Sequence, residues 1–188
     1  MIYGLVGRSG SGKTTAAAIF AENGFFVVDC DKVAAEVLST DGSVKKALAE
    51  AFGGDVLVDG KVDKKLVAER AFADREELDK LNSITHPPII ERLAKLCEGK
   101  EKALLDAPTL FESGAYRLCG AVIAVIASDE ACEKRLLARD GASLASIRRR
   151  LAMQKSDEFL REKADIIIEN NGDEADFRRQ VEYVAQTL

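Results

Sequence analysis

Five short apolar runs, separated by longer stretches with helical periodicity, dominate the pattern of hydrophobic and polar positions in this 188-residue chain. The runs are Ile2–Val6, Phe25–Asp29, Ala103–Asp106, Ala121–Ala127 and Asp165–Ile168. Continuous apolar runs of this length are typical of strands buried on both faces of a parallel sheet. Because helical stretches separate them, the pattern predicts an α/β fold in which a five-stranded parallel sheet lies between layers of helices.

Helical periodicity is clearest next to the first run and at the C-terminus. A helix is predicted over Thr14–Asn23, and the pair Asn23-Gly24 is a typical helix stop. At the C-terminus, apolar residues recur at spacings of four, three and four, which predicts an amphipathic helix packed on the sheet. These residues are Phe177, Val181, Val184 and Leu188.

The stretch between the second and third runs is too long for a simple crossover. Its periodicity predicts helices over Lys64–Phe72 and Arg75–Ile84, and a further helix from about Pro88 to Cys97. The sequence His86-Pro87-Pro88 is expected to break the chain before that last helix, because proline disrupts a helix interior but suits its first turn. Asp59-Gly60 predicts a turn. We interpret residues 32–99 as a helical insertion that binds a substrate.

A helical pair lies between the fourth and fifth runs. The pattern predicts one helix over Glu130–Arg139, a turn at Asp140-Gly141-Ala142, and a second helix over Ser143–Lys155 with Ser143 as its cap. We interpret residues 138–155 as a small lid. Residues 1–31, 100–137 and 156–188 then form the core of a single domain.

The stretch from Gly7 to Thr14 has the spacing Gly-x-x-x-x-Gly-Lys-Thr and lies between a predicted strand and a predicted helix. Glycines let backbone N–H groups surround phosphate oxygens, Lys13 reaches the outer phosphates, and the Thr14 hydroxyl is a ligand for Mg²⁺. The helix N-terminus adds partial positive charge. The stretch therefore predicts a nucleotide site, against the alternative of a glycine-rich turn without a ligand.

Three carboxylates follow the predicted strands, at the sheet edge where α/β proteins bind their ligands. Asp31 is placed where a general base would meet an acceptor hydroxyl. Asp29 is a candidate for the magnesium site, and Asp106 for either the magnesium side or the acceptor. The alternative for each is a helix cap or a solvated loop end.

Arginines of the lid are candidates for phosphate contacts, since a guanidinium matches phosphate oxygens. We select Arg139 and Arg150; the alternative is a solvated, charged helix face. His86 is either a turn residue or a substrate contact. Asn170 begins a turn that either borders the adenine or is a simple loop.

Composition restricts the function further. A net charge of −5 and a pI near 5.1 argue against a protein that binds nucleic acid along a basic face. No apolar run approaches membrane-spanning length, and the chain starts directly with a strand, so we expect no membrane association and no signal peptide. Four widely spaced cysteines and one histidine predict free thiols, no metal centre and a reducing, cytoplasmic setting.

Several motifs together resemble the dephospho-CoA kinase family over nearly the whole chain. They are the glycine loop starting at Gly4-Leu5, Val-Asp-x-Asp at 28–31, Leu-Asn-x-Ile-x-His-Pro at 81–87, Leu-Asp-x-Pro-x-Leu-Phe-Glu at 105–112, Arg139-Asp140, Arg150 with Gln154, and Ala-Asp-x-Ile-Ile-x-Asn at 164–170. The resemblance implies a P-loop kinase that transfers the ATP γ-phosphate to the ribose 3′-hydroxyl of dephospho-CoA. It implies ATP and Mg²⁺, and no obligate protein partner is evident.

The resemblance also implies roles for individual residues. Asp31, Lys13 and Arg139 are the expected catalytic residues, and Thr14 and Asp29 the expected metal ligands. The expected ATP contacts are Gly7, Ser9, Gly10, Ser11, Gly12, Lys13, Thr14, Thr15, Arg139, Arg150 and Asn170. The expected acceptor contacts are Asp31, His86, Asp106, Pro108, Leu110 and Phe111.

The chain departs from the family pattern at Val6, where relatives usually have Thr, and at Arg8-Ser9, where they usually have Gly-Ile. The Thr hydroxyl missing at Val6 bears on the affinity for the acceptor more than on the reaction. Two alternatives are another small-molecule kinase of the same architecture and a nucleotide-switched binding protein. The absence of an Asn-Lys-x-Asp motif disfavours a GTPase switch.

Overall fold

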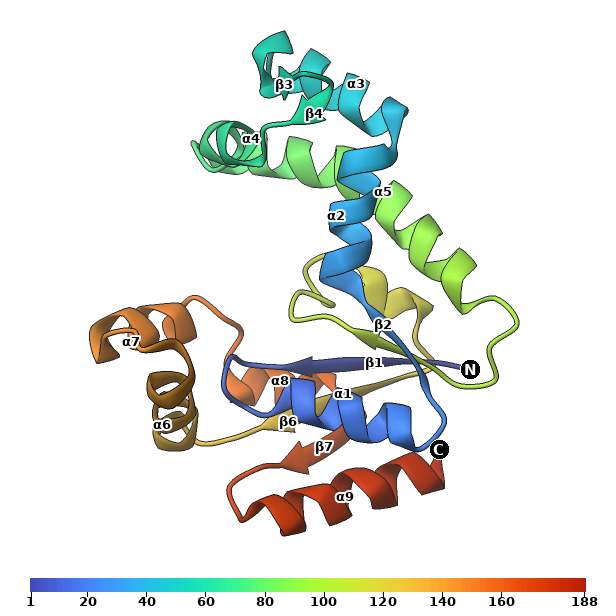
Figure 1. The fold of residues 1–188 in the computed structure, drawn as a ribbon, viewed down its shortest axis with the longest axis vertical. Helices are drawn as coiled ribbons and strands as arrows, with labels where there is room; N and C mark the ends of the chain where they lie inside the picture. The colour runs from blue at the N-terminus through green and yellow to red at the C-terminus, as the bar shows by residue number, and fades with distance from the viewer. The chain divides into compact units, whose positions relative to one another are not determined.

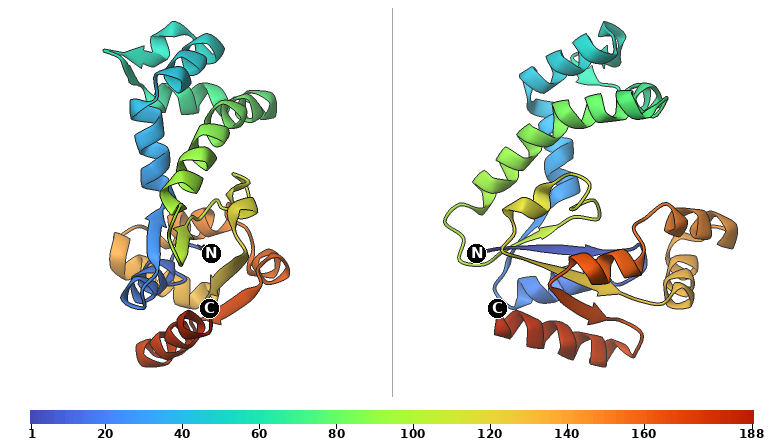
Figure 2. Two further views of the ribbon diagram at one scale, coloured as in Figure 1. Left: turned by 90° about the vertical axis from the view of Figure 1, so that its right-hand side faces the viewer. Right: turned by 180° about the vertical axis from the view of Figure 1, so that it is seen from behind.

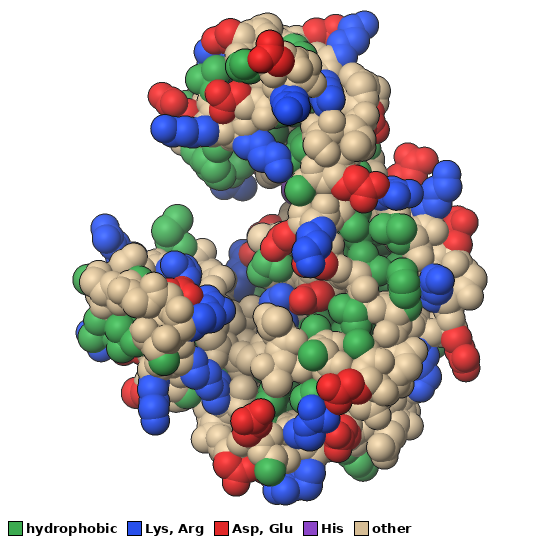
Figure 3. Space-filling view, viewed as in Figure 1, with side chains coloured by type: hydrophobic (Ala, Val, Ile, Leu, Met, Phe, Trp, Pro, Cys, Tyr) green, Lys and Arg blue, Asp and Glu red, His purple; other side chains and the backbone are tan.

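The computed structural model describes residues 1–188, which form two compact units. Unit 1 consists of Met1–Val28 and Gly99–Leu188, and unit 2 consists of Asp29–Glu98. Figure 1 shows both along the chain, with unit 2 in the colours between blue and light green. Lys and Arg side chains are interspersed with Asp and Glu on the face drawn in Figure 3.

A five-stranded parallel sheet is the centre of unit 1, as predicted. The strand order is β2-β5-β1-β6-β7. Their bounds are β1 Ile2–Gly7, β2 Phe26–Asp29, β5 Ala103–Asp106, β6 Ala121–Ile126 and β7 Ile166–Glu169. The non-consecutive order brings the carboxyl ends of β1 and β5 next to each other, so the residues that follow these strands share one edge of the sheet.

Helices lie on both faces of this sheet and beyond one end of its strands. They are α1 Lys13–Glu22, α6 Asp129–Asp140, α7 Leu144–Ala152, α8 Asp157–Lys163 and α9 Glu174–Thr187, together with the 3₁₀ helix η2 Ala115–Leu118. The pair α6–α7 is the part that lies beyond the end of the strands (Figure 1). α1 packs against α9, and Figure 2 shows α8 on the face opposite to α1. Phe20 of α1 and Phe177 and Val181 of α9 are buried with Leu5 and Ile123 of the sheet. The predicted C-terminal helix is thus confirmed.

Unit 2 is mainly helical. Its elements are α2 Cys30–Thr40, α3 Gly42–Phe52, the 3₁₀ helix η1 Gly54–Val56, β3 Leu57–Val58, β4 Lys61–Val62, α4 Lys64–Ala71 and α5 Arg75–Cys97. α5 packs against α2, α3 and α4. Val44, Leu48, Val56, Val67 and Leu93 are buried, so the unit has apolar residues of its own to exclude water.

The predicted chain break at His86-Pro87-Pro88 is wrong, because α5 is one helix of 23 residues that contains both prolines. Proline lacks an N–H, but its fixed φ is close to the helical value, so the chain stays helical where packing supports both halves. Figure 1 shows α5 bending partway along its length, and prolines are a recognised cause of such bends.

Two further predictions need correction. Burial of the second strand on both faces is wrong for Phe26, which is 39% exposed because β2 lies at the edge of the sheet. The predicted turn at Asp59-Gly60 exists, with φ of 51° and 73°, but it joins the strands β3 and β4 of a small hairpin that we did not predict. None of the helices is both long and apolar enough to cross a membrane.

Candidate functional site

The loop between β1 and α1 forms one wall of a cavity of about 420 Å³ in unit 1. Gly7 ends the strand and Lys13 begins the helix, as the sequence predicted within one residue. The cavity is lined by the loop residues Gly7, Arg8, Ser9, Gly10, Gly12, Lys13, Thr14 and Thr15, and by Pro108, Arg135, Leu136, Arg139 and Gln154. The residues expected to bind ATP in the loop therefore line this cavity, except Ser11, which is buried.

Two glycines give the loop its shape. Gly10 and Gly12 have φ of 81° and 104°, in the region that side chains disfavour. A Cβ on Gly12 would lie 2.3 Å from the Asn170 amide nitrogen, and one on Gly10 would lie 2.8 Å from the Cys132 carbonyl oxygen. The loop is therefore packed closely against α6 and the end of β7.

Lys13 pairs with Asp106 at the carboxyl edge of the sheet. The two side chains are 16% and 17% exposed, so the pair is partly shielded from water. The register of β1 and β5 places Asp106 beside Leu5, and this brings the carboxylate to the base of the loop. Lys13 thus has a protein anion as its partner where the sequence predicts a phosphate.

Asn170 joins the loop to α6. Its Nδ2 donates to the Ser11 carbonyl (2.7 Å), while its Oδ1 and its carbonyl oxygen accept from Arg135 (3.0 and 2.9 Å). Arg135 also donates to the Gly10 carbonyl (3.2 Å). The Asn170 side chain is buried and its groups are satisfied by the protein, which suits it to shaping the loop.

Sequence reasoning did not select Arg135, although it lines the cavity. Its partners are carbonyl groups of Gly10 and Asn170, which no side-chain pattern reveals. One signal was available: Arg135 precedes Arg139 by four residues on the same helix, so both lie on one helix face.

The two selected lid arginines share one partner. Arg139 Nε donates to Asp140 Oδ1 (2.6 Å) and Arg150 Nη1 donates to Asp140 Oδ2 (2.7 Å). These hydrogen bonds, with that from Arg139 the stronger influence, lower the pKa of Asp140 to about 2. Arg139 lines the loop cavity, whereas Arg150 is absent from its lining. Ser143 caps α7 by accepting from the Ser146 N–H, as predicted.

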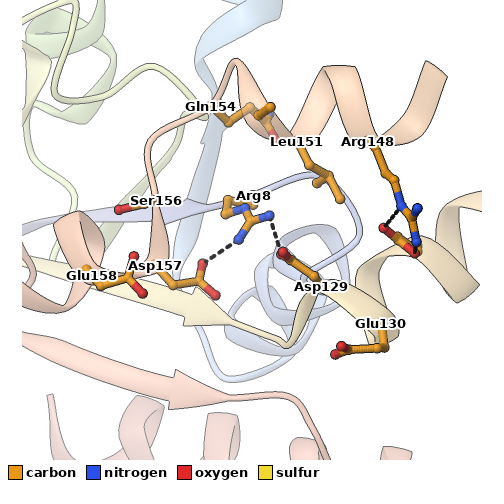
Figure 4. Close-up of a pocket in the computed structure, with 11 residues that line it drawn as sticks. Arg8, Asp129, Glu130, Arg148, Leu151, Gln154, Ser156, Asp157 and Glu158 are labelled. Carbon is orange, nitrogen blue, oxygen red and sulfur yellow. Dashed lines mark hydrogen bonds and ion pairs between the residues drawn. The ribbon is translucent and has the colours of Figure 1, made fainter. Parts of the chain in front are cut away.

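A second cavity, of about 770 Å³, lies beside the loop (Figure 4). Arg8 extends into it between Asp129 at the start of α6 and Asp157 at the start of α8. Burial alone would lower the pKa of the Arg8 guanidinium, but the neighbouring carboxylates outweigh burial and raise it. Burial raises the pKa of Asp157, and the Arg8 charge only partly opposes this.

Asp29 and Asp31 lie where β2 leads into α2, and both belong to unit 2. Asp29 caps α2 by accepting from the Lys32 N–H (3.0 Å), and Lys32 Nζ also lies 3.0 Å from its Oδ2. Burial alone would raise the pKa of Asp29, but these contacts outweigh it and lower the pKa. Asp31 is an exposed residue in the first turn of α2.

The expected acceptor residues differ in how far their side chains are accessible. Burial lowers the pKa of His86, in the middle of α5, below its ordinary value, which favours a neutral imidazole. Pro108 lines the loop cavity. Leu110 is fully buried, so its side chain belongs to the core. Phe111 packs against Tyr116 and Phe159.

The donor set of the loop cavity suits a polyphosphate with a hard cation. The lining residues offer backbone N–H groups, an ammonium and guanidinium groups, which suit phosphate oxygens, and Thr14, in the first turn of α1, offers a hydroxyl oxygen. The chain has no cluster of three or more His, Cys, Asp or Glu side chains that could hold a metal. Mg²⁺ commonly retains water and phosphate ligands around one or two protein oxygens, so this set fits it.

Comparisons with known proteins agree with this geometry. Residues 1–176 match the dephospho-CoA kinase family. A dephospho-CoA kinase of Fusobacterium nucleatum is 37% identical, with 100% of this chain and 98% of that relative covered. A dephospho-CoA kinase of Corynebacterium efficiens is 36% identical, with 95% and 92% covered.

Solved structures agree as well. The crystal structure of TT1252 from Thermus thermophilus has a TM-score of 0.82 at 30% identity and covers 100% of this chain and 97% of its own. The dephospho-CoA kinase from Campylobacter jejuni has a TM-score of 0.72 at 30% identity, covering 98% and 95%. A shikimate kinase from Acinetobacter baumannii, at 18% identity and a TM-score of 0.55, shares the fold.

Proposed function

The chain belongs to the dephospho-CoA kinase family, and on this premise we propose that it transfers the γ-phosphate of ATP to the ribose 3′-hydroxyl of dephospho-CoA, giving coenzyme A and ADP. It is an ATP-dependent phosphotransferase that acts on an alcohol group. The observation that carries the proposal is the family match over residues 1–176, which includes both the phosphate loop and the lid.

The loop residues hold the phosphates of ATP. Backbone N–H groups of Gly10 to Thr15 and the N-terminus of α1 face the negative charge. Lys13 exchanges its contact with Asp106 for the β- and γ-phosphates, because these carry more charge than one carboxylate. Arg139 contacts the transferring phosphoryl group, where charge develops in the transition state. Its place in the lining of the loop cavity supports this role.

Mg²⁺, when bound, neutralises phosphate charge and helps to align the transferring group. Thr14 would supply one ligand oxygen. Asp29 would orient a water molecule bound to Mg²⁺, because Lys32 already contacts its carboxylate in this structure. Asp106 would accept from such water once Lys13 has moved to the phosphates.

The acceptor hydroxyl must lose a proton, and we assign that proton to the Asp31 carboxylate. Asp31 is exposed at the start of α2, as a base that meets an incoming substrate must be. We propose His86, in unit 2, and Asp106, Pro108 and Phe111, in unit 1, as acceptor contacts. A neutral His86 imidazole can both donate and accept a hydrogen bond.

None of the four cysteines forms a disulfide bond, which suits a reducing compartment and supports a cytoplasmic location. We propose that the enzyme needs no protein partner for the reaction. The alternatives of another small-molecule kinase and of a nucleotide-switched binding protein are not favoured by the family match.

The direct test offers the purified protein ATP, Mg²⁺ and dephospho-CoA beside a panel of nucleosides, nucleotides and shikimate, and measures ADP release. We expect release to depend on dephospho-CoA. ADP release with another acceptor, and none with dephospho-CoA, would show that the proposed substrate is wrong but that the protein is a kinase. Slow release that no acceptor stimulates would instead indicate a nucleotide switch.

Removal of the proposed base gives a quantitative prediction. Asp31→Asn should lower kcat by roughly two to four orders of magnitude, the usual loss when general acid–base catalysis is removed. The KM for dephospho-CoA should change little, because asparagine keeps the size and polarity of the side chain. Asp41→Asn, at the cap of α3 in the same unit, is the control and should leave kcat unchanged. An effect of Asp31→Asn on KM alone would contradict the assignment.

A further inference from the structure

Two consecutive residues of the phosphate loop, Arg8 and Ser9, contact both ends of the helical pair α6–α7. At the start of the pair, Arg8 Nη2 donates to Asp129 Oδ1 at 2.6 Å. Beyond its end, Arg8 Nη1 lies 3.5 Å from Asp157 Oδ1, at the start of α8. Figure 4 shows the guanidinium between these two carboxylates. The Arg8 side chain is 11% exposed, so water screens these charges weakly.

Ser9 is held by Gln154, two residues after the end of α7. The Ser9 N–H donates to Gln154 Oε1 (2.9 Å), and Gln154 Nε2 donates to Ser9 Oγ (3.2 Å). The oxygen and the nitrogen of one side-chain amide thus bind the backbone N–H and the hydroxyl of one loop residue. Gln154 also lines the loop cavity. A change in the position of Ser9 would therefore move Gln154, just after the end of α7.

The helical pair α6–α7 (Asp129–Ala152), called the lid from here on in place of the predicted range 138–155, has a small apolar cluster of its own. Cys132 and Leu136 of α6 pack with Ile147 and Leu151 of α7 and with Ala127 at the end of β6. This cluster is separate from the large cluster that joins the sheet to α1 and α9. The helical pair is therefore packed on itself rather than on the core beneath α1 and α9. Arg135 ties α6 to the loop at Gly10, and Arg8 and Gln154 add contacts at the start of the pair and just beyond its end.

We propose that Arg8 and Gln154 are positioning residues that couple the phosphate loop to the lid, so that a nucleotide in the loop orders α6 and α7 and brings Arg139 to the phosphates. Neither side chain needs to touch the reacting atoms. The inference rests on the proposed function through the role of Arg139. Its first test is independent of phosphate transfer.

Hydrogen exchange measures the coupling directly. Adenylyl imidodiphosphate with Mg²⁺ should slow the exchange of loop amides 10–15 and of lid amides 141–153 in the unchanged protein, the latter about tenfold. In Gln154→Met and in Arg8→Met the loop amides should still be protected, while protection of the lid falls to about threefold or less. Equal protection of the lid would overturn the proposal. So would the loss of protection in the loop, because Gln154 and Arg8 would then serve nucleotide binding itself.

Two matched controls lie on α9, outside loop and lid. Gln180 donates to the Glu169 carbonyl and to Asp176 (both 3.1 Å), and Arg178 bridges Glu22 and Glu182 (2.7 and 3.1 Å). Gln180→Met and Arg178→Met remove similar polar contacts and should leave protection of the lid unchanged. If they reduce it as strongly as the loop variants do, the effect reflects general stability and the proposal fails.

A kinetic cycle provides a second readout. Gln154→Met should lower kcat/KM for ATP about tenfold in the unchanged protein and about twofold or less after Arg139→Ala, since its effect passes through Arg139. Equal losses in both backgrounds would overturn the coupling. If Arg139→Ala alone left the rate unchanged, the proposed role of Arg139 would fail, and the exchange experiment would still decide whether loop and lid are coupled.

Discussion

Gly10 and Gly24 both have backbone conformations that disfavour side chains, yet their surroundings differ. Gly24, two residues after the end of α1, has φ of 87°, and no atom lies within 4 Å of where its Cβ would be. At Gly10, with φ of 81°, a Cβ would meet the carbonyl oxygen and the Cα of Cys132 at 2.8 and 3.0 Å. The neighbour at Gly10 is backbone of α6, which cannot rotate away as a flexible side chain can.

This pair allows the close packing of the phosphate loop to be measured. Gly24→Ala should cost about 1–2 kcal/mol, the usual penalty for an L-residue in the left-handed region. Gly10→Ala should cost more, by about 1–3 kcal/mol, because the loop or α6 must also shift. Urea unfolding of both variants gives the two free energies. Equal costs would show that α6 moves aside freely, which contradicts close packing between the loop and the lid helix.

Single residues also show why part of the site could be predicted from the sequence. The roles of Lys13 and Thr14 follow from spacing, because the loop chemistry is local. Arg8, Arg135 and Gln154 act through partners more than 30 residues away, several of them backbone groups. Nothing in the local sequence of an arginine or a glutamine indicates which distant carbonyl or carboxylate it contacts.

At the level of elements, Asp140 joins the two helices of the lid. It is the last residue of α6, and Arg139 of the same helix and Arg150 of α7 both donate to its carboxylate. Gly141 follows with φ of 61° and lets the chain turn into α7. The angle between the helices therefore depends on one ionised carboxylate as well as on the apolar cluster beneath it.

Low pH should weaken the contacts of Asp140 with Arg139 and Arg150. The pKa of Asp140 is lowered from 3.8 to about 2 in the folded protein, so its ionised form stabilises the fold above pH 3.8, and this contribution is lost as the pH falls towards 2. The unchanged protein and Asp140→Asn should therefore differ in their free energy of unfolding by a constant amount near neutral pH. This difference should become smaller as the pH falls below 4. Thermal unfolding at several pH values measures it.

The arginines provide the control for that experiment. In an Arg139→Met/Arg150→Met background, Asp140 loses both donors, and the pH-dependent part of the Asp140→Asn difference should disappear. If the difference kept its pH dependence there, the carboxylate would be stabilised by something other than the two lid arginines.

Elements were predictable where packing follows a local period. The inner strands of the sheet are buried on both faces and α9 on one, and the spacing of their apolar residues shows this. The bend of α5 was read as a break because proline rules describe an isolated helix, whereas contacts with α2, α3 and α4 support both halves. α8, only seven residues long with Leu160 alone buried, carries too few apolar residues for a period to be visible.

On the scale of the whole molecule, the chain divides into two units that carry different spectroscopic probes. It has no tryptophan, and its three tyrosines, Tyr3, Tyr116 and Tyr183, all belong to unit 1. About half of the helical residues, those in α2 to α5, belong to unit 2. Tyrosine fluorescence therefore reports unfolding of unit 1 alone, while far-ultraviolet circular dichroism reports both units.

A nucleotide that binds the loop should stabilise the two units unequally. Ligand at 100 times its Kd adds about 2.7 kcal/mol to the folded state that binds it. For a chain of this size that shifts Tm by about 5–10 °C. Because the loop and its cavity lie within unit 1, adenylyl imidodiphosphate should raise the tyrosine transition, while part of the dichroism transition stays at its original temperature. Lys13→Met should abolish the shift. Coincident transitions at saturating nucleotide would contradict the prediction and show that both units unfold as one cooperative body.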